Sequence, residues 1–206
     1  MISILLLFLF IRWDDILFAE KNQTHKHYFH AFYFACVWSW ETWLLATAHD
    51  CVDLFKVQIL WYVHCLLESW VQDRQRSDFA MMMAHHVLAV VLIVGAFWTN
   101  NHQIGLVVLV EQDFADIIIN ICKIIHKSVS SATVHSVCIV ILAISWFMTR
   151  IVLLGMIIVW SASFTTYKNW GLLALLCVLW YMQMVWGLRI SRLAWTHFQY
   201  GVIQDE

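Results

Sequence analysis

Six apolar stretches, each long enough to cross a bilayer, constrain this sequence more than any other feature. An α-helix needs about 20 apolar residues to span the hydrocarbon core. Backbone that faces lipid must satisfy its own hydrogen bonds, which favours helices for runs of this length. The sequence therefore predicts an all-α membrane protein with six transmembrane helices, over the ranges Tyr28–Ala48, Leu54–Val71, Phe79–Trp98, Ile104–Ile125, Val134–Trp160 and Trp170–Ile190.

The overall composition excludes a water-soluble globule. Hydrophobic residues make up 62% of the 206 residues and charged residues only 13%, whereas about a quarter of a typical soluble domain is charged. The net charge of −2 provides no basic field for nucleic acid, so we expect no nucleic-acid partner. The six cysteines show no metal-binding spacing and mostly lie in apolar segments, which indicates packing residues.

The chain shows no internal repeat or linker, which predicts one main domain over residues 21–195 and a cytosolic tail over 196–206. Residues 1–20 form a short apolar segment that is interrupted by Arg12, Asp14 and Asp15. A signal-peptide core, an interfacial anchor and a short or truncated helix are all compatible with it, and we favour the last because no charged start or cleavage site is evident.

Lysine and arginine are distributed unequally over the connections between the apolar stretches. If the segment before Tyr28 is cytosolic, the opposite side holds only Lys56 and Lys168. By the positive-inside rule this topology is preferred, and it places the C-terminus in the cytosol. The residues on the cytosolic side are then Lys21, Lys26, Arg74, Arg76, Lys123, Lys127, Arg189 and Arg192.

Ionisable residues inside the apolar stretches are candidates for function, because burying them in a membrane is costly. His85 and His86 lie about 10 Å below the cytosolic face at 1.5 Å per residue. Asp113 and Asp116 share a face of the next stretch, and Asp116 reaches a similar depth. An imidazole acts as a base or a nucleophile and a carboxylate can orient it, so these four residues are predicted to be catalytic.

Metal chemistry is an alternative use of the same side chains. Membrane di-iron enzymes carry many histidines in tight clusters, whereas most of the histidines here are scattered, so iron is not expected. Histidine and aspartate are both permitted zinc ligands, which leaves a single zinc as an open alternative. We expect no metal and no cofactor.

The residues from Asp73 to His86, DRQRSDFAMMMAHH, resemble the D-x-K-R-x-D-F-x-x-M-x-x-H-H signature of ceramide synthases, the Lag1-type members of the TLC-domain proteins. Asn100, Gly105, Asp113, Asp116 and Lys123 fall at the spacing of further motifs of that family. Trp61–Tyr62 resembles its paired aromatics, and Trp146–Arg150 its late F-x-x-x-R helix. The resemblance covers about residues 28–192.

The resemblance implies a six-helix TLC-type bundle around a lipid tunnel in the endoplasmic reticulum membrane. Such an enzyme transfers a fatty acyl group from acyl-CoA, its co-substrate, to the amine of a sphingoid base. Its partners are these substrates and membrane lipids, and either a homodimer or a heterodimer is compatible with it. Asn100 and Arg150 are expected to be structural or tunnel residues. The residues expected to bind the CoA phosphates are Arg74, Arg76, Lys123 and Lys127, although ordinary positive-inside topology also explains these cations.

Several positions depart from the family pattern. Gln112 replaces the histidine of an H-D pair, and Asn120 replaces a glutamate. Gln103, Gly155 and Gln183 are further departures. Because glutamine cannot exchange a proton, a TLC-domain protein that binds or senses lipid without catalysis is an alternative, and an enzyme with another acyl acceptor is a third.

Overall fold

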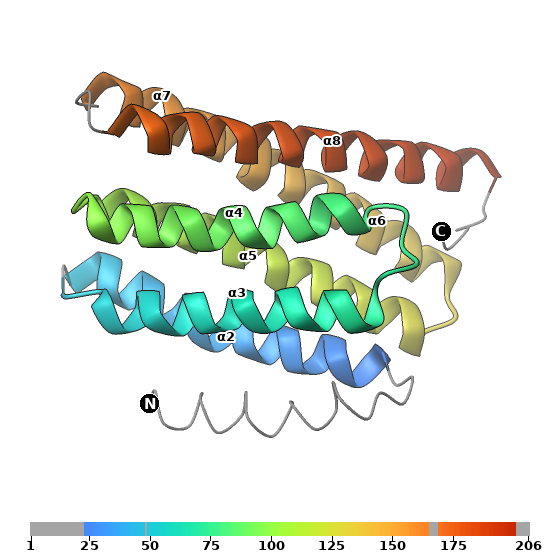
Figure 1. The fold of residues 1–206 in the computed structure, drawn as a ribbon. Helices are drawn as coiled ribbons and strands as arrows, with labels where there is room; N and C mark the ends of the chain where they lie inside the picture. The colour runs from blue at the N-terminus through green and yellow to red at the C-terminus, as the bar shows by residue number, and fades with distance from the viewer. Residues whose placement is uncertain (1–22, 48, 165–168, 201–206) are drawn as a thin grey trace.

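The computed structural model describes residues 23–47, 49–164 and 169–200, and these ranges are helical apart from short connections (Figure 1). The predicted segment 1–20 lies outside them. The helices are α2 (Gln23–Thr47), α3 (Val52–Gln72), α4 (Phe79–Trp98), α5 (His102–Ser128), α6 (Ala132–Trp146), the π-helix η1 (Phe147–Leu153), α7 (Leu154–Phe164) and α8 (Trp170–Tyr200).

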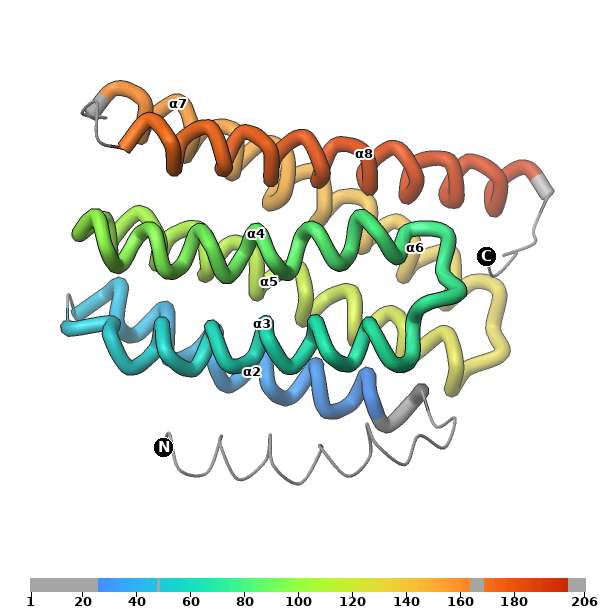
Figure 2. Tube along the Cα trace, in the orientation of Figure 1, coloured from blue at the N-terminus to red at the C-terminus, as the bar shows by residue number. Residues whose placement is uncertain are grey.

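The helices run side by side along one bundle axis, and consecutive long helices alternate in direction (Figures 1 and 2). In the view of Figure 1, α3, α4 and α8 form a front row, with α2, α5 and α6 behind it. The packing is not sequential, because α2 packs against α5 and α8 packs against both α4 and α6. The middle helices, α4 and α5, are therefore enclosed by elements from both ends of the chain.

Each apolar stretch corresponds to helix in the structure. The predicted bounds of Phe79–Trp98 are correct, and α2, α3 and α5 deviate by a few residues at their ends. α8 continues to Tyr200, beyond the predicted end at Ile190 and into the segment expected to be a tail.

The fifth stretch was predicted as one uniform helix, and that detail is wrong. Its central turn, Phe147–Leu153, is a π-helix between α6 and α7. A π-helical turn changes which side chains face a neighbouring helix and is frequent at functional sites. Here it carries Arg150, whose side chain is buried.

Three helical segments are long and apolar enough to cross a membrane, namely Phe79–Trp98, Ala132–Ser163 and Trp170–Gln199. The chain is therefore a multi-pass membrane protein. α2, α3 and α5 have comparable lengths, but polar residues interrupt their apolar surfaces. A buried polar residue lowers the mean hydropathy of a helix although it faces the bundle rather than lipid, which is why these three are less clear by composition.

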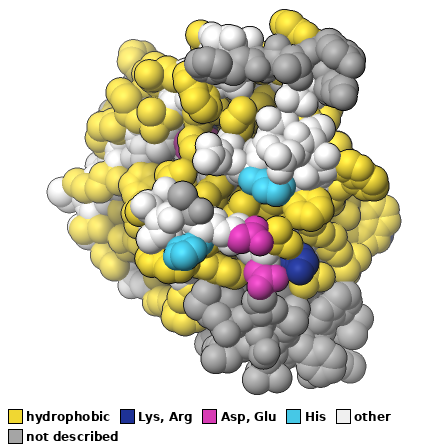
Figure 3. Space-filling model, turned by 90° about the vertical axis from the view of Figure 1, so that its left-hand side faces the viewer, with side chains coloured by type: hydrophobic (Ala, Val, Ile, Leu, Met, Phe, Trp, Pro, Cys, Tyr) yellow, Lys and Arg dark blue, Asp and Glu magenta, His cyan; other side chains and the backbone are white. Residues whose placement is uncertain are grey.

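The two ends of the bundle differ in charge. Among the described residues, Lys56 is the only lysine or arginine at the end where α2 joins α3 and α4 joins α5, and it pairs with Asp53. Figure 3 looks onto this end and shows hydrophobic side chains over much of it, with a few acidic, basic and histidine side chains near its centre. Most other cations lie toward the opposite end, which agrees with the predicted asymmetry. This is the end that the positive-inside rule predicts to be cytosolic, and we refer to it as the cytosolic end.

Candidate functional site

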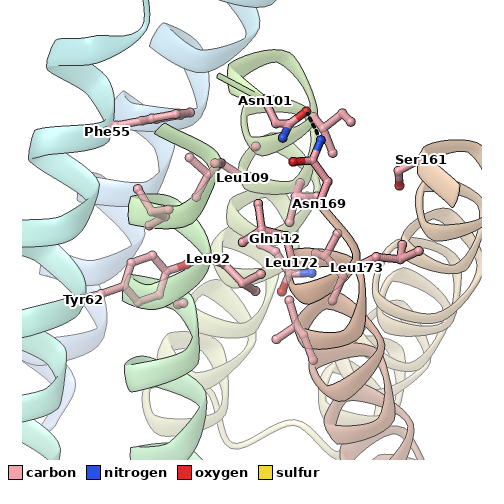
Figure 4. Close-up of a pocket in the computed structure, with 18 of the residues that line it drawn as sticks. Phe55, Tyr62, Leu92, Asn101, Leu109, Gln112, Ser161, Asn169, Leu172 and Leu173 are labelled. Atoms are coloured by element: carbon pink, nitrogen blue, oxygen red, sulfur yellow. Dashed lines mark hydrogen bonds between the residues drawn. The ribbon is translucent and has the colours of Figure 1, made fainter. Parts of the chain in front are cut away.

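A cavity of about 150 Å³ lies inside the bundle between α3, α4, α5, α7 and α8 (Figure 4). Its walls are mostly aliphatic, with leucine, isoleucine, valine and alanine side chains from α4, α5 and α8. Gly105 is part of the wall, where an added Cβ would lie 3.0 Å from the Cβ of Ala96 and 3.2 Å from the ring of Phe55. A cavity with such walls suits a hydrocarbon chain.

Polar side chains mark the two ends of this cavity. At one end the Nδ2 group of Asn169 donates to Oδ1 of Asn101 over 3.4 Å (Figure 4). At the other end lie His85, Tyr62 and Gln112. On α4 the wall runs from Ala96 to His85, a distance of about 16 Å at 1.5 Å per residue. The cavity is therefore elongated along the bundle and apolar over its length, and its inner end, the end farther from the α4–α5 turn, carries a histidine.

The two adjacent histidines have different surroundings. The ring of His85 lines the cavity and packs edge-on against Trp186 with centroids 5.4 Å apart. His86 is not part of the cavity wall, and its ring centroid lies 5.5 Å from that of His85. Neither ring hydrogen-bonds to the described part of the chain. Of the two, His85 is the one placed to meet a ligand in the cavity.

Tyr62 lies close to all four residues that were predicted to be catalytic. Its ring centroid lies 6.4 Å from that of His85 and 6.0 Å from that of His86. Asp113 and Asp116 are among its electrostatic neighbours. The structure thus brings both histidines and both aspartates to one region, as their depths in the sequence predicted.

The expected pairing of the aspartates with the histidines is wrong for the described residues. Asp116 accepts a hydrogen bond of 2.8 Å from Nη2 of Arg150 and forms a salt bridge with it. Asp113 accepts a hydrogen bond of 2.6 Å from Nε2 of Gln58. The packing brings the Gln58 amide from α3 and the Arg150 guanidinium from η1 within hydrogen-bond distance of these carboxylates. The guanidinium–carboxylate hydrogen bond is of the stronger, charge-assisted kind.

Two residues near Asp113 were missed in the sequence. Nε2 of Gln58 also donates to Oε1 of Glu41 over 2.7 Å, so one amide bridges carboxylates from α2 and α5. Glu41 is fully buried. The signal was present, because Glu41 lies within an apolar stretch, but sequence spacing does not show that α2 packs on α5.

Arg150, expected to be a structural or tunnel residue, has three hydrogen-bond acceptors in the structure. Besides Asp116 it donates to the side-chain and backbone oxygens of Gln112. Nε2 of Gln183 donates to the same Gln112 side-chain oxygen over 3.0 Å. Two departures from the family pattern, Gln112 and Gln183, are therefore neighbours in one buried network, which indicates a structural role for both.

A second polar network lies toward the cytosolic end and ties α2 to α3 and α5. Nζ of Lys26 lies 3.0 Å from Asp73 and 3.6 Å from Glu68. His30 lies 3.0 Å from Glu68. Nδ1 of His27 lies 3.1 Å from the side-chain oxygen of Asn120, another departure from the pattern.

The four cations expected to bind phosphate are differently engaged. Nε of Arg74 donates to the carbonyl of Trp70, and its guanidinium stacks 4.2 Å from that ring. Arg76 makes two hydrogen bonds to Asp78, of 3.0 and 3.1 Å. Although burial raises the pKa of Asp78, the hydrogen bonds and charge of Arg76 hold it below its ordinary value.

Lys123 and Lys127 lie in the last two turns of α5. The Lys123 ammonium makes no hydrogen bond or ion pair with the residues that the structure describes, and its electrostatic neighbours include Arg76, Lys26 and Asp73. Lys123 is thus able to donate hydrogen bonds to a ligand at the cytosolic end. Arg76 already donates two hydrogen bonds to Asp78.

Asn100 has a backbone role in the turn between α4 and α5. Its φ of 58° is in the left-handed region, which asparagine tolerates better than most residues. Its side chain is exposed, and the neighbouring Asn101 lines the cavity instead. The structural alternative for Asn100 is supported, and the tunnel role belongs to Asn101.

Comparison with known proteins matches the cavity-forming bundle to one family. The family model TRAM_LAG1_CLN8, described as TLC domain, matches residues 3–192. The chain belongs to the TLC domain family. No solved structure matches it significantly.

Similar TLC-domain relatives are named ceramide synthases. The ceramide synthase LOH2 of Arabidopsis thaliana is 30% identical over 98 residues, covering 48% of this chain and 33% of that protein. The ceramide synthase hyl-2 of Caenorhabditis elegans is 25% identical over 185 residues, covering 81% of this chain and 56% of that protein. Human ceramide synthase 4 is 25% identical over the same length, covering 81% of this chain and 46% of that protein. The chain thus matches about a third to just over half of the length of these relatives.

Proposed function

We propose that this TLC-domain protein is an acyl-CoA-dependent N-acyltransferase that joins a fatty acyl group to the amine of a sphingoid base. The observation that carries the proposal is the apolar cavity with His85 at its inner end. The names of the similar proteins agree with this substrate class. In the proposed setting, α2, α3, α4, α5, the α6–α7 segment and α8 are six membrane spans in the endoplasmic reticulum.

The cavity and the cations would bind different parts of acyl-CoA. The acyl chain would occupy the apolar tunnel, so that its thioester lies at His85. The CoA portion would then extend toward the cytosolic end, where, among the described residues, Lys123 has no hydrogen-bond or ion-pair partner and the outer nitrogens of Arg74 have no acceptor. A hydrophobic tail buried in protein and a phosphate held by cations at the surface each meet an environment that suits them.

His85 supplies the chemistry that amide formation requires. The ammonium form of the amine cannot attack a thioester, and a neutral imidazole either removes its proton or attacks the thioester itself. Asp116 and Asp113 would not contact the substrate. Their carboxylates accept hydrogen bonds from Arg150 and Gln58, and these bonds fix α5 against the neighbouring helices. The reaction needs acyl-CoA as co-substrate and no further cofactor.

The proposal is tested by product analysis. Membranes containing this chain, from a host without ceramide synthase, are given acyl-CoA of several lengths and several amines, and products are identified by mass spectrometry. N-acylated sphingoid base is the expected product. Acylation of another amine would identify a different acceptor.

Absence of product beside an active relative would contradict the proposal and favour the lipid-binding alternative. Gln112→His then asks whether an inactive protein gains activity when a protonatable group is restored.

Lys123→Ala is expected to raise the KM for acyl-CoA about tenfold, as for loss of one charged hydrogen bond, with little change in kcat. Arg192→Ala is the matched control, since Arg192 is an exposed cation on α8 at the same end of the bundle. Steady-state kinetics at varied acyl-CoA concentration measures both variants. If Lys123→Ala and wild type have equal KM values, Lys123 does not bind the CoA phosphates, and its position reflects only the positive-inside rule.

A further inference from the structure

Tyr62 on α3 presents its phenol to the inner end of the cavity. Its ring is almost completely buried, yet the residue is part of the cavity wall, and Figure 4 shows its hydroxyl directed inward from α3. Its ring meets that of His85 edge-on, with an interplanar angle of 78°. The hydroxyl makes no hydrogen bond to the described residues and is not among their fully buried atoms, so it is a donor that is open to the cavity beside the histidine.

The other polar groups of the cavity wall are already engaged. The side-chain oxygen of Gln112 accepts from Arg150 and Gln183, and its amide donates to Glu111 over 2.7 Å. Asn101 and Asn169 bond to each other at the far end. The hydroxyl of Ser161 donates to the carbonyl of Ile157. Among the described residues that line the cavity, the donor with unused capacity next to His85 is therefore Tyr62, since Trp186, which also packs against His85, is not part of the wall.

An unused buried donor is costly in an apolar setting, because a hydroxyl without a partner loses the hydrogen bonds that water would supply. Such groups persist where a ligand provides the missing partner. A hydrocarbon chain has no acceptor, but the thioester at its head has a carbonyl oxygen. The position of Tyr62 at the histidine end matches the place where that oxygen would lie.

We propose that the Tyr62 hydroxyl donates a hydrogen bond to the thioester carbonyl oxygen and stabilises the oxyanion that forms there. The inference rests on the proposed acyl transfer and assigns it a catalytic residue. Donors of this kind stabilise charge that develops only in the transition state, and loss of one such donor lowers kcat by about 10²- to 10³-fold.

The chemical step balances whether the imidazole or the amine attacks first. A nitrogen lone pair forms a bond to the carbonyl carbon, and the π electrons of the C=O bond move to the oxygen that Tyr62 faces. When the C=O bond re-forms, the C–S bond breaks and CoA leaves as a thiolate that takes up a proton. If the imidazole attacks first, the amine then attacks the carbonyl carbon of the acyl-imidazole in the same way, and the bond from that carbon to the histidine nitrogen breaks. Overall, a protonated amine and an acyl thioester give an amide, CoA thiol and one proton.

Tyr62→Phe removes the hydroxyl and keeps the ring that packs against both histidines. The expected result is a kcat about 10²- to 10³-fold below wild type, with an unchanged KM for acyl-CoA. Tyr181→Phe is the matched control, because Tyr181 is an exposed tyrosine on α8 that is not part of the cavity wall. This control is expected to show wild-type kinetics.

A second measurement separates chemistry from folding and binding. An alkyl-CoA thioether has the tail and CoA portion but no carbonyl oxygen, so wild type and Tyr62→Phe are expected to bind it with equal affinity. Wild-type kcat in Tyr62→Phe would overturn the inference and leave the proposed function intact. A higher KM with unchanged kcat would also overturn it, since it indicates a role in binding alone. Failure of wild type itself to form amide would instead refute the proposed function.

Discussion

His85→Ala is expected to abolish N-acyl transfer, with a fall in turnover of about 10⁴-fold or more, as for loss of a nucleophile or base in other acyl-transfer enzymes. The physical reason is that His85 is the histidine on the cavity wall, where a thioester attached to a buried acyl chain would lie. Amide formation from acyl-CoA and sphingoid base, measured by mass spectrometry on the purified protein in detergent, gives the result directly.

His49→Ala is the matched control for this variant. His49 is an exposed histidine in the connection between α2 and α3, and it stacks on Trp43 with ring centroids 5.1 Å apart. Its loss is expected to leave turnover unchanged. Thermal unfolding of each variant shows whether the bundle still forms. Wild-type turnover in a folded His85→Ala protein would refute the assignment of the cavity as the site of acyl transfer.

Arg150→Met is expected to lower the free energy of unfolding by about 3 kcal/mol, the typical cost of removing one partner from a buried ion pair. The Arg150 side chain is 2% exposed and holds both Asp116 and Gln112. Methionine fills much of the same volume, but it leaves a carboxylate and an amide without their donor. Chemical unfolding in detergent, followed by tryptophan fluorescence, measures the change.

Lys56→Met provides the comparison with an exposed ion pair. Lys56 and Asp53 have side-chain exposures of 67% and 59%, and pairs of this kind contribute between about 0 and 1 kcal/mol. Adding Asp116→Leu to Arg150→Met is expected to recover part of the lost stability, since the unpaired carboxylate is then absent. Equal effects of Lys56→Met and Arg150→Met would contradict the importance of the buried network.

Depth within the helices was predictable from the sequence, and pairing between side chains was not. Counting residues from the helix ends placed His85, His86 and the two aspartates at similar levels, and Tyr62 contacts or lies near all four. The rise per residue fixes depth once a helix crosses the bundle. Which donor a carboxylate meets depends instead on how the helices rotate and pack, which explains why Gln58 and Arg150 were not expected at Asp113 and Asp116.

The cavity illustrates the same division. The sequence showed that the helices are rich in aliphatic residues. The cavity forms only because α4, α5 and α8 enclose one volume together with α3 and α7. The π-helical turn that aims Arg150 at α5 was also absent from the sequence pattern. Its geometry differs from an α-helix in backbone hydrogen bonding, which hydrophobic periodicity does not record.

The sequence by itself determined that this chain is a membrane-embedded helical bundle, because the length and polarity of its apolar stretches follow from the thickness and low dielectric of a bilayer. The residues from Asp73 to His86 also indicated the family, and the family model that matches residues 3–192 confirms it. Only the tertiary structure decided that His85 rather than His86 faces the cavity, and that Tyr62 lines the cavity beside it. Adjacent residues on a helix point about 100° apart, so packing alone selects the one that meets the ligand.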